Sequence, residues 1–192
     1  LDVDFYVTST HKICGPTGVG ILYGKEKWLN KIPPFLGGGE MIDQVTFEKS
    51  TYAGLPNKFE AGTPNISGVI ASGIGIDYLN SIGLENIYNY EKELLDYATK
   101  KLVLIKGLKI YGVSTEKTSV ISFNVGNIHP YDIGSILDKF GIATRTGQLC
   151  AQPIMDYFKI PGTIRVSFSF YNTKEEIDQF IEALHKAILM LS

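Results

Sequence analysis

Lys12 lies in a short polar segment whose composition predicts a tight turn. Thr10-His11-Lys12 follows an apolar stretch at Phe5–Val7, and Gly15-Pro16-Thr17-Gly18 supplies residue types that turns require. A lysine held at a fixed position can form a Schiff base with an aldehyde cofactor, provided that partial desolvation keeps its amine neutral. A solvated surface lysine is the commoner alternative, and position by itself does not separate the two.

Cys150 is a second candidate for chemistry, because its neighbours indicate a loop. Gly147 precedes it and Pro153 follows it, and loops often display reactive side chains. A nearby arginine favours the thiolate, the nucleophilic form of cysteine. A buried, inert cysteine is the alternative, and this is how we interpret Cys14. Two cysteines cannot build a disulfide framework, which favours a reducing, cytosolic setting.

Arginine is rare in this chain and lies close to the candidate cysteine. Of 18 basic residues, Arg145 and Arg165 are the only arginines, and both are near Cys150 in sequence. Arginine is required where a carboxylate is bound in a planar, bidentate way, a task that lysine performs poorly. Arg165 also alternates with the apolar Ile164 and Val166, so its side chain should point away from the core. A structural ion pair is the alternative.

Other kinds of site find little support in the sequence. His11, His129 and His185 are scattered, and no His or Cys pair has the spacing of metal ligands, so no metal site is predicted. Gly37-Gly38-Gly39 matches a phosphate cradle in composition only, since no nucleotide-binding motif accompanies it. A net charge of -2 gives no general attraction to nucleic acid or to an anionic membrane. No apolar run is long enough to span a bilayer.

The elements that must position these residues alternate along the chain. We expect strands at residues 5–7, 19–23, 119–125, 142–144 and 164–170, the second of them buried. We expect helices at residues 66–81, 84–106, 130–141 and from Thr173 onward, the last opened by a capping box of Thr173 and Glu176. Residues 37–56 are predicted to form a projecting hairpin or loop.

Two further expectations follow from the sequence. One comes from the glycines in the first long helix, and the other from the distribution of strands. Gly68, Gly73 and Gly75 lower helical propensity, which suggests close packing of the helix backbone against another segment. The first part of the chain, up to Gly83, has too few strands for a stable open sheet, whereas the second part predicts a self-sufficient sheet backed by helices.

Taken together, the motifs resemble one enzyme family. Thr10-His11-Lys12 followed by Gly15–Gly20 resembles the cofactor-lysine segment of the class-V aminotransferase group of fold-type-I pyridoxal-phosphate enzymes. Within that group, Gly37–Ile42 and Phe59–Asn65 are similar to segments of the cysteine desulfurases. Two further motifs resemble the SUF-type branch of these enzymes. They are Arg145-Thr146-Gly147 with Cys150–Pro153, and Arg165 ahead of Tyr171-Asn172-Thr173. The resemblance covers essentially the whole chain, in order.

The resemblance implies an α/β fold in two parts. Residues 1–83 would be the C-terminal remnant of the large pyridoxal-phosphate domain, and residues 84–192 a complete small α+β domain. The chain starts with Leu1 and the resemblance begins just upstream of the lysine, so we expect the family's N-terminal half to be missing. Family residues that contact the cofactor ring lie in that half. We therefore expect this chain alone to be inactive and to bind the cofactor weakly or not at all.

The resemblance also implies roles for single residues. Lys12 would hold pyridoxal 5'-phosphate, be displaced by the substrate L-cysteine and then move its Cα proton, with the cofactor ring as electron sink. The thiolate of Cys150 would attack the substrate sulfur and keep it as a persulfide, releasing L-alanine. Arg165 matches the family's arginine for the substrate carboxylate, and Arg145 matches a second active-site arginine.

Further contacts and partners follow from the same resemblance. Gly62 and Thr63 match a segment that reaches the cofactor phosphate of the partner subunit, which implies a homodimer. His11, beside the lysine, is a candidate contact for the phosphate. A sulfur-acceptor protein would take the persulfide sulfur for iron–sulfur cluster assembly in the cytoplasm.

One departure from the family pattern precedes the cysteine. Family members often have histidines there, whereas this chain has Gln148 and Leu149, neither of which can transfer a proton. Two alternatives stay open. One is another class-V enzyme of kynureninase or epimerase type, which needs no nucleophilic cysteine. The other is a non-catalytic docking module for a sulfur acceptor.

Overall fold

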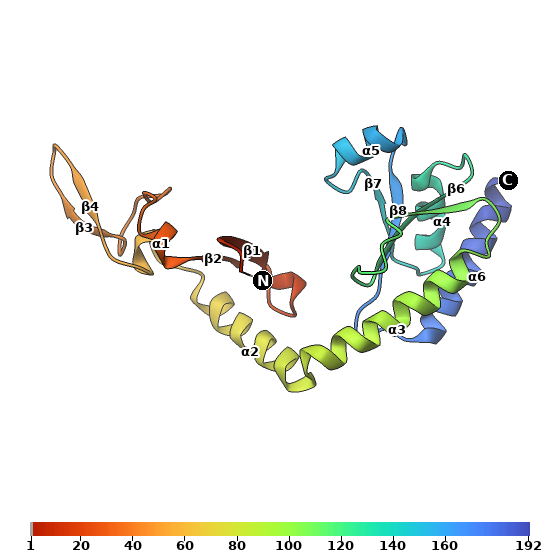
Figure 1. Ribbon diagram of the computed structural model, residues 1–192, viewed down its shortest axis with the longest axis horizontal. Helices are drawn as coiled ribbons and strands as arrows, with labels where there is room; N and C mark the ends of the chain where they lie inside the picture. The colour runs from red at the N-terminus through yellow and green to blue at the C-terminus, as the bar shows by residue number, and fades with distance from the viewer. Residues whose placement is uncertain (1) are drawn as a thin grey trace. The chain divides into compact units, whose positions relative to one another are not determined.

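The computed structural model describes residues 2–192 and combines helices and strands in a mixed α/β fold (Figure 1). The chain divides into two compact units, Leu1–Gly83 (unit 1) and Leu84–Ser192 (unit 2). The predicted α/β class is confirmed. The interpretation of unit 1 as the remnant of a large cofactor-binding domain, and of unit 2 as a small C-terminal domain, stays a prediction.

Unit 1 contains two separate two-stranded sheets and one long helix. Its elements are β1 (Phe5–Ser9), a 3-10 turn (Thr10–Lys12), β2 (Gly20–Gly24), α1 (Glu26–Leu29), β3 (Ile42–Val45), β4 (Ser50–Tyr52), a second 3-10 turn (Asn57–Phe59) and α2 (Ile66–Ile82). β1 pairs with β2, and β3 pairs with β4, both in antiparallel fashion. β3 and β4 are the hairpin predicted within residues 37–56.

β2 corrects the prediction of a buried strand at residues 19–23. Its side chains Ile21, Leu22 and Tyr23 are 38%, 52% and 52% exposed. Within the described part of the chain, β2 pairs with β1 alone, and so narrow a sheet leaves its faces open to water unless other segments cover them. The apolar run therefore predicted the strand correctly but not its burial.

α2 begins and ends at residues suited to those positions. Asn65 is its N-cap, and the Asn65 side-chain oxygen accepts a hydrogen bond from the backbone N–H of Gly68 at 3.1 Å. Gly83 ends the helix with a φ of 93°, in the left-handed region that favours glycine. α3 follows directly.

Unit 2 is a four-stranded antiparallel sheet with helices. Its elements are α3 (Leu84–Leu102), β5 (Leu108–Tyr111), β6 (Val120–Val125), α4 (Pro130–Lys139), β7 (Arg145–Gly147), α5 (Gln152–Phe158), β8 (Thr163–Ser167) and α6 (Lys174–Leu191). The strand order is β5-β6-β8-β7, and each neighbouring pair is antiparallel. A sheet backed by helices is the arrangement that the sequence predicts for this part of the chain.

Two predicted bounds in unit 2 are wrong. α3 ends at Leu102 and not near residue 106, because the Ile105 N–H donates to the Leu102 carbonyl in a turn that leads into β5. The short strand predicted at residues 142–144 lies instead at β7. The reason is local, since the Ile142 N–H is still bound to the Leu137 carbonyl of α4 and is not available to a strand.

α3, α4 and α6 cover one face of the sheet and enclose the core of unit 2 (Figure 1). The sheet contributes Ile121, Phe123 and Ile164, which are fully buried at the alternating positions that the sequence predicts. The helices contribute fully or nearly fully buried residues, namely Leu94, Ala98, Leu102, Ile133, Leu137, Ile177, Phe180 and Leu184. Burial of apolar area at roughly 25 cal/mol per Å² makes this core the main stabilising feature of unit 2.

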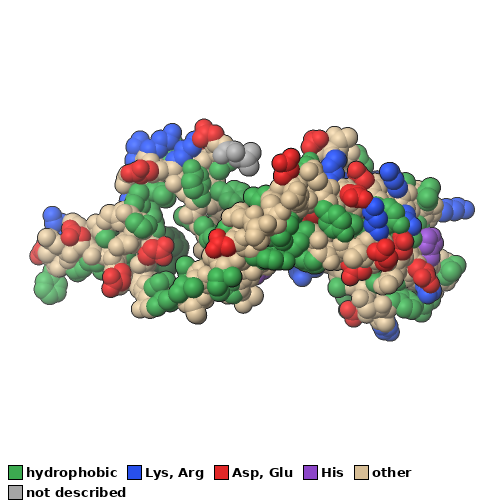
Figure 2. All heavy atoms as spheres, turned by 90° about the horizontal axis from the view of Figure 1, so that it is seen from below, with side chains coloured by type: hydrophobic (Ala, Val, Ile, Leu, Met, Phe, Trp, Pro, Cys, Tyr) green, Lys and Arg blue, Asp and Glu red, His purple; other side chains and the backbone are tan. Residues whose placement is uncertain are grey.

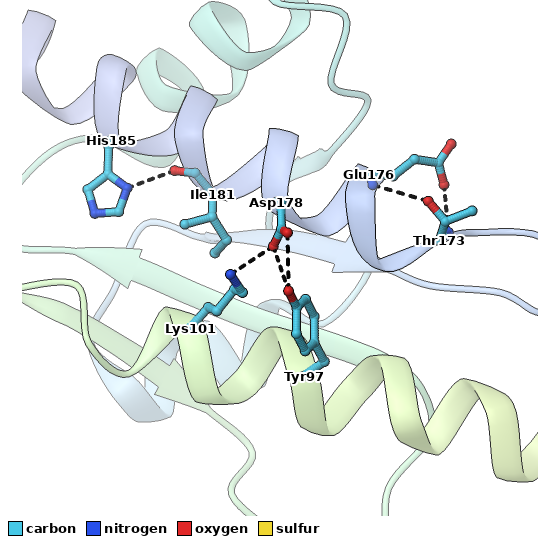
Figure 3. Close-up of polar contacts among 7 residues, drawn as sticks. All are labelled: Tyr97, Lys101, Thr173, Glu176, Asp178, Ile181 and His185. Carbon is cyan, nitrogen blue, oxygen red and sulfur yellow. Dashed lines mark hydrogen bonds and ion pairs between the residues drawn. The ribbon is translucent and has the colours of Figure 1, made fainter.

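Polar contacts tie α6 to α3 at the surface (Figure 3). The Asp178 carboxylate accepts a hydrogen bond from the Tyr97 hydroxyl at 2.9 Å and pairs with Lys101 Nζ at 2.8 Å. The Lys101 ammonium, and then the Tyr97 hydroxyl, hold the pKa of Asp178 below its ordinary value. The capping box predicted for α6 is confirmed, because Thr173 and Glu176 each accept a hydrogen bond from the other's backbone N–H.

Candidate active site

Thr10 anchors the loop that carries His11 and Lys12. The Thr10 side chain is fully buried, and its hydroxyl donates to the Pro16 carbonyl at 2.8 Å. The backbone N–H of Thr10 donates to the Val19 carbonyl at 3.1 Å. These bonds close residues 10–19 into a compact loop and so hold the backbone of Lys12 in place. The sequence interpretation missed Thr10, although a small polar residue directly after a strand is a typical loop anchor.

Small residues of α2 allow the lysine loop to pack against the helix backbone. A Cβ at Gly75 would lie 2.7 Å from the Cys14 carbonyl oxygen, and a Cβ at Gly68 would lie 2.8 Å from Val19 Cγ2. Both distances are too short for a real Cβ, so glycine is required. The predicted close approach is confirmed at Gly68 and Gly75. It is wrong at Gly73, whose Cβ position has no described atom within 4 Å.

Cys14 corrects a second prediction, because its side chain is exposed and does not pack in the interior. Its φ of 62° lies in the left-handed region, which is uncommon for a residue with a side chain. The next residue, Gly15, lies so close to Thr10 that a Cβ there would be 2.8 Å from the Thr10 Cβ. The tight turn needed for this contact leaves Cys14 on the outside. Lys12 is exposed as well.

The Gly37–Gly39 run packs against the segment that contains Gly62. The Gly62 N–H donates to the Gly39 carbonyl at 3.0 Å, and a Cβ at Gly38 would lie 3.2 Å from the Gly62 nitrogen. Close backbone contact thus accounts for glycine at position 38, and a φ of 80° accounts for Gly62. Thr63, the next residue, is exposed.

The segment with Gly62 and Thr63 meets the lysine loop at the N-terminal end of α2. The contact is made by the N-cap residue Asn65, whose side-chain nitrogen lies 3.5 Å from the Cβ position of Gly18. Asn65 therefore serves both the helix and the loop. The sequence interpretation quoted Asn65 within a motif but did not identify it as the N-cap, although asparagine directly before a helix is a common N-cap signal.

Cys150 lies in a strained turn between β7 and α5. Leu149 and Cys150 have φ values of 56° and 60°, and two consecutive non-glycine residues in the left-handed region are uncommon. The Ala151 N–H donates to the Gln148 carbonyl at 2.9 Å and closes the turn. The side chain of Cys150 is exposed. The alternative of a buried, inert cysteine therefore does not hold.

Arg145 and Arg165 are cross-strand neighbours. Arg145 of β7 lies directly opposite Arg165 of β8, and such opposed residues share a face of the sheet with Cβ atoms about 4.5–5.5 Å apart. Ile164 and Val166, which flank Arg165, are buried on the helix-covered face. Arg165 thus points away from the core, as predicted. An anion that binds to both guanidinium groups would offset the repulsion between their like charges.

Arg165 is half-buried, and its Nε atom is buried without a hydrogen-bond partner in residues 2–192. Two further polar residues lie deep on the same face. Asn124 is 9% exposed and Thr163 is 1% exposed. The sequence interpretation missed both. The signal was present, because each occupies a polar position that alternates with apolar residues in its strand.

The predicted site residues of each unit lie on segments that contact one another or follow directly in the chain. In unit 2, β7 carries Arg145, pairs with the strand of Arg165 and leads into the turn of Cys150. In unit 1, the loop of His11 and Lys12 meets the segment of Gly62 and Thr63 near the start of α2. The meeting of the two groups at one cofactor stays a prediction.

The described residues also bear on metal binding and on membrane insertion. Among residues 2–192, no group of three His, Cys, Asp or Glu side chains is arranged to hold a metal ion. In the same stretch, no helix has both the length and the apolar character that crossing a membrane would require.

Comparison with known proteins identifies relatives along the whole chain. The family model for class-V aminotransferases matches residues 1–180. A cysteine desulfurase of Cronobacter sakazakii is 49% identical over 185 residues, covering 96% of this chain and 45% of the relative. A probable cysteine desulfurase of Streptomyces coelicolor is 48% identical and is covered to 44%, with 96% of this chain aligned. The chain thus spans less than half the length of these relatives.

Solved structures lead to the same family. The crystal structure of the cysteine desulfurase CsdA (S-sulfonic acid) from Escherichia coli matches with a TM-score of 0.93 and 36% identity, covering 100% of this chain and 47% of that chain. The apo structure of a cysteine desulfurase from Thermococcus onnurineus matches with a TM-score of 0.92 and 38% identity, covering 98% of this chain and 48% of that chain. The family resemblance inferred from the motifs is confirmed.

Proposed function

The chain belongs to the class-V aminotransferase family, and on that premise we propose that it is the C-terminal part of a pyridoxal-phosphate-dependent cysteine desulfurase. The parent enzyme would convert L-cysteine to L-alanine and transfer the sulfur to Cys150 as a persulfide. The names of the similar proteins support the reaction, and the arrangement of residues in unit 2 supports the roles.

The observation that carries the proposal is the course of β7, which runs from an arginine to the cysteine turn. Arg145 lies opposite Arg165, and the exposed Cys150 follows β7 in the next turn. Guanidinium groups on adjacent strands offer planar donors for a carboxylate. A sulfur nucleophile close by in the chain suits a substrate that carries both a carboxylate and a sulfur atom. L-cysteine is such a substrate.

The residues of unit 1 fit pyridoxal 5'-phosphate. Lys12 offers an exposed primary amine on a loop whose backbone is held by the buried Thr10, and an aldehyde cofactor requires an amine at a fixed place. His11 would contact the phosphate of the cofactor bound at Lys12, and Gly62 and Thr63 would reach the phosphate bound by the partner subunit. When bound, the cofactor supplies an electron sink for the substrate carbon atoms.

Each of the four proposed site residues then has a defined task. Arg165 and Arg145 bind and orient the substrate carboxylate. Lys12 would hold the cofactor, and its free amine would move the Cα proton of the substrate. The Cys150 thiolate forms a bond to the substrate sulfur while the Cβ–S bond breaks. The electron pair of that bond stays with carbon, which takes up a proton. The sum is L-cysteine plus the Cys150 thiol giving L-alanine plus the Cys150 persulfide.

Gln148 and Leu149 place a limit on this mechanism. Neither side chain can donate or accept a proton at the sulfur. Cys150 must therefore lose its own proton to solvent or to a group on another segment before it attacks.

We further propose a homodimer that works in the cytoplasm and passes its sulfur to an acceptor protein for iron–sulfur cluster assembly. The exposed turn of Cys150 supports the last step, because a persulfide there can be reached from outside. We also propose that the chain of residues 1–192 alone is inactive and binds the cofactor weakly, which the open apolar faces of β1 and β2 support.

Mass spectrometry of the parent enzyme tests the reaction. After incubation with pyridoxal phosphate and L-cysteine, we expect one added sulfur on the peptide with Cys150 and release of L-alanine. Cys150→Ala should abolish both. Cys14→Ser changes the other exposed cysteine and should leave both intact. Full turnover by the Cys150→Ala enzyme would favour another class-V enzyme of kynureninase or epimerase type. A parent protein that makes neither product would favour a docking module.

A further inference from the structure

Three buried polar atoms on one face of the unit 2 sheet have no hydrogen-bond partner in residues 2–192. They are Asn124 Oδ1, Thr163 Oγ1 and Arg165 Nε. Buried polar atoms are nearly always paired, because an unpaired one loses its bonds to water without replacement. Three such atoms on adjacent strands therefore indicate groups that find a partner in another state of the site.

The register of the sheet places Asn124 diagonally across from Arg165. In the β6–β8 pair, Ser122 lies opposite Arg165 and Phe123 lies opposite Ile164. Asn124 and Ser122 are two residues apart and so share a face with Arg165. Diagonal neighbours of this kind have Cα atoms about 7–8 Å apart, within reach of long side chains.

The orientation of the Asn124 amide follows from its one hydrogen bond. Its Nδ2 atom donates to the Gly162 carbonyl at 2.9 Å. A carbonyl can only accept, so the amide nitrogen must face Gly162 and the amide oxygen must face away from it. Within residues 2–192, Arg165 Nε is a donor without an acceptor, and Asn124 Oδ1 is an acceptor without a donor. The two atoms are complementary.

The Gly162 bond links Asn124 to the turn of Cys150. Gly162 lies against β7, where a Cβ on Gly162 would be 2.7 Å from the Gly147 carbonyl carbon. Gly147 is the last residue of β7 and has a φ of 105°. A change in the position of Gly162 must therefore move the start of the Cys150 turn.

We propose that Asn124 is a positioning residue that couples Arg165 to the Cys150 turn. Its Nδ2 atom holds Gly162 against Gly147. Its Oδ1 atom accepts the Arg165 Nε–H bond when the guanidinium turns to bind the carboxylate of L-cysteine. This inference rests on the proposed desulfurase function and deepens it.

Burial explains why the acceptor for Arg165 Nε must come from the protein and not from the ligand. Arg165 Nε is enclosed by the protein, so a ligand that arrives from solvent meets the outer nitrogens of the guanidinium. Bonding Nε from behind fixes the plane of the guanidinium group. The two outer nitrogens then keep the geometry that a bidentate carboxylate contact requires.

Steady-state kinetics of the parent holoenzyme test the coupling. Asn124→Leu keeps the size of the side chain and removes both polar atoms. We expect its KM for L-cysteine to rise about tenfold, as expected for loss of a hydrogen bond to a charged group. In an Arg165→Lys background, which has no guanidinium to orient, Asn124→Leu should raise KM no further. A merely structural role would lower the active fraction, and with it kcat, at unchanged KM.

Two further variants separate the two halves of the amide and guard against misfolding. Asn124→Asp keeps an acceptor for Arg165 Nε and loses the donor to Gly162, so we expect its KM to stay within about twofold of wild type, in contrast to the rise for Asn124→Leu. Thr144→Val is the matched control. It also removes a buried, unpaired polar atom, but one that faces Gly134 of α4 on the helix-covered side. Its KM should not change.

Specific outcomes would overturn the inference. A wild-type KM for Asn124→Leu, or an equal rise in KM with and without Arg165→Lys, would show that Asn124 does not act through Arg165. If Ser122→Ala, and not Asn124→Leu, raised KM in a way that depends on Arg165, the acceptor for Arg165 Nε would be Ser122. These results differ from a failure of the proposed function, in which the wild-type parent makes no L-alanine from L-cysteine at all.

Discussion

Unit 1 and unit 2 show the same kinds of sequence pattern but differ in what those patterns bury. In unit 2, the apolar stripes of three helices close over one face of a sheet, and the residues at their centre are fully buried. In unit 1, the strands β1 and β2 also contain apolar runs, yet Val7 of β1 is 73% exposed. Pattern alone therefore predicts an element, whereas stability requires a second surface that covers it.

The surface of unit 1 is accordingly rich in apolar side chains. Figure 2 shows green hydrophobic groups at the surface over this unit. The exposed hydrophobic residues of unit 1 include members of β1, β2 and α2, namely Phe5, Tyr6, Val7, Leu22, Tyr23, Ile66, Val69, Ile70 and Ile74. Many exposed apolar side chains in one unit are typical of an interface with further protein. The buried residues of unit 1 are Met41, which precedes β3, and four small residues at the contact between α2 and the lysine loop, namely Thr10, Gly68, Ser72 and Gly75.

Hydrogen exchange should give the largest difference between the units. For the chain of residues 1–192, amides of β6 and β8 should exchange only on global unfolding of unit 2, because a closed core protects them. Amides of β1 and β2 should exchange on the order of a thousandfold faster or more. Mass spectrometry of exchanged peptides measures the ratio. Equal protection in the two sheets would mean that unit 1 is as stable as unit 2, which would contradict the lower stability expected for an uncovered sheet.

Matched phenylalanine substitutions should give the next largest effect. Phe123→Ala removes a fully buried ring from the core of unit 2 and should lower its free energy of unfolding by about 3–5 kcal/mol. Phe47→Ala removes a ring that is fully exposed in the hairpin of unit 1. Its effect should stay within about 0.5 kcal/mol. Urea unfolding followed by circular dichroism measures both, and a loss above 2 kcal/mol for Phe47→Ala, a magnitude typical of buried rings, would contradict the exposed placement.

Two alanine substitutions in α2 test the packing of the lysine loop. Gly75→Ala inserts a methyl group 2.7 Å from the Cys14 carbonyl oxygen and should destabilise the contact by about 1–3 kcal/mol. Gly73→Ala inserts a methyl group into open space and should stabilise the helix by about 0.5–1 kcal/mol. Thermal unfolding of the parent holoenzyme measures the pair. A shift of the melting temperature in the same direction for both variants would contradict the packing of Gly75, but not Gly73, against the lysine loop.

The Asp178 contacts predict a small, pH-dependent effect on unit 2. The folded-state pKa of Asp178 is lowered, first by Lys101 and then by Tyr97. A lowered pKa means stabilisation that is present above the unfolded-state value of about 3.9 and is lost as pH falls through the folded-state pKa. Asp178→Asn should therefore be slightly less stable than wild type at pH 7. The difference should shrink as pH falls below the unfolded-state value of about 3.9, as urea unfolding at pH 7 and at pH 3 would show.

An ion-pair control sharpens this last prediction. Glu182 pairs with Lys186 within α6 and does not join two helices. Glu182→Gln should therefore have a smaller effect at pH 7 than Asp178→Asn, because a pair within one helix contributes little to tertiary structure. Equal effects would mean that the link from Asp178 to α3 adds nothing.

Much of unit 2 could be predicted from the sequence, because its local patterns and its tertiary contacts agree. The alternation around Phe123 and Ile164 predicted strands with a defined buried face, and both residues are buried there. Thr173 and Glu176 predicted the start of α6 through contacts that lie within one helical turn. The misplacement of β7 arose where Ile142 still belongs to the turn after α4, a bond that no alternation pattern reveals.

The sequence by itself determined the family, the elements and the residue types that perform chemistry, because motifs and periodic patterns are local properties of the chain. Only the tertiary structure decided that Thr10 holds the lysine loop, that Gly75 admits the Cys14 carbonyl and that Cys14 is exposed. The same holds for Asn124 and its place beside Arg165. The physical reason is that a period of two or of 3.6 residues tells which side of an element is apolar, but the atoms that meet that side come from distant parts of the chain.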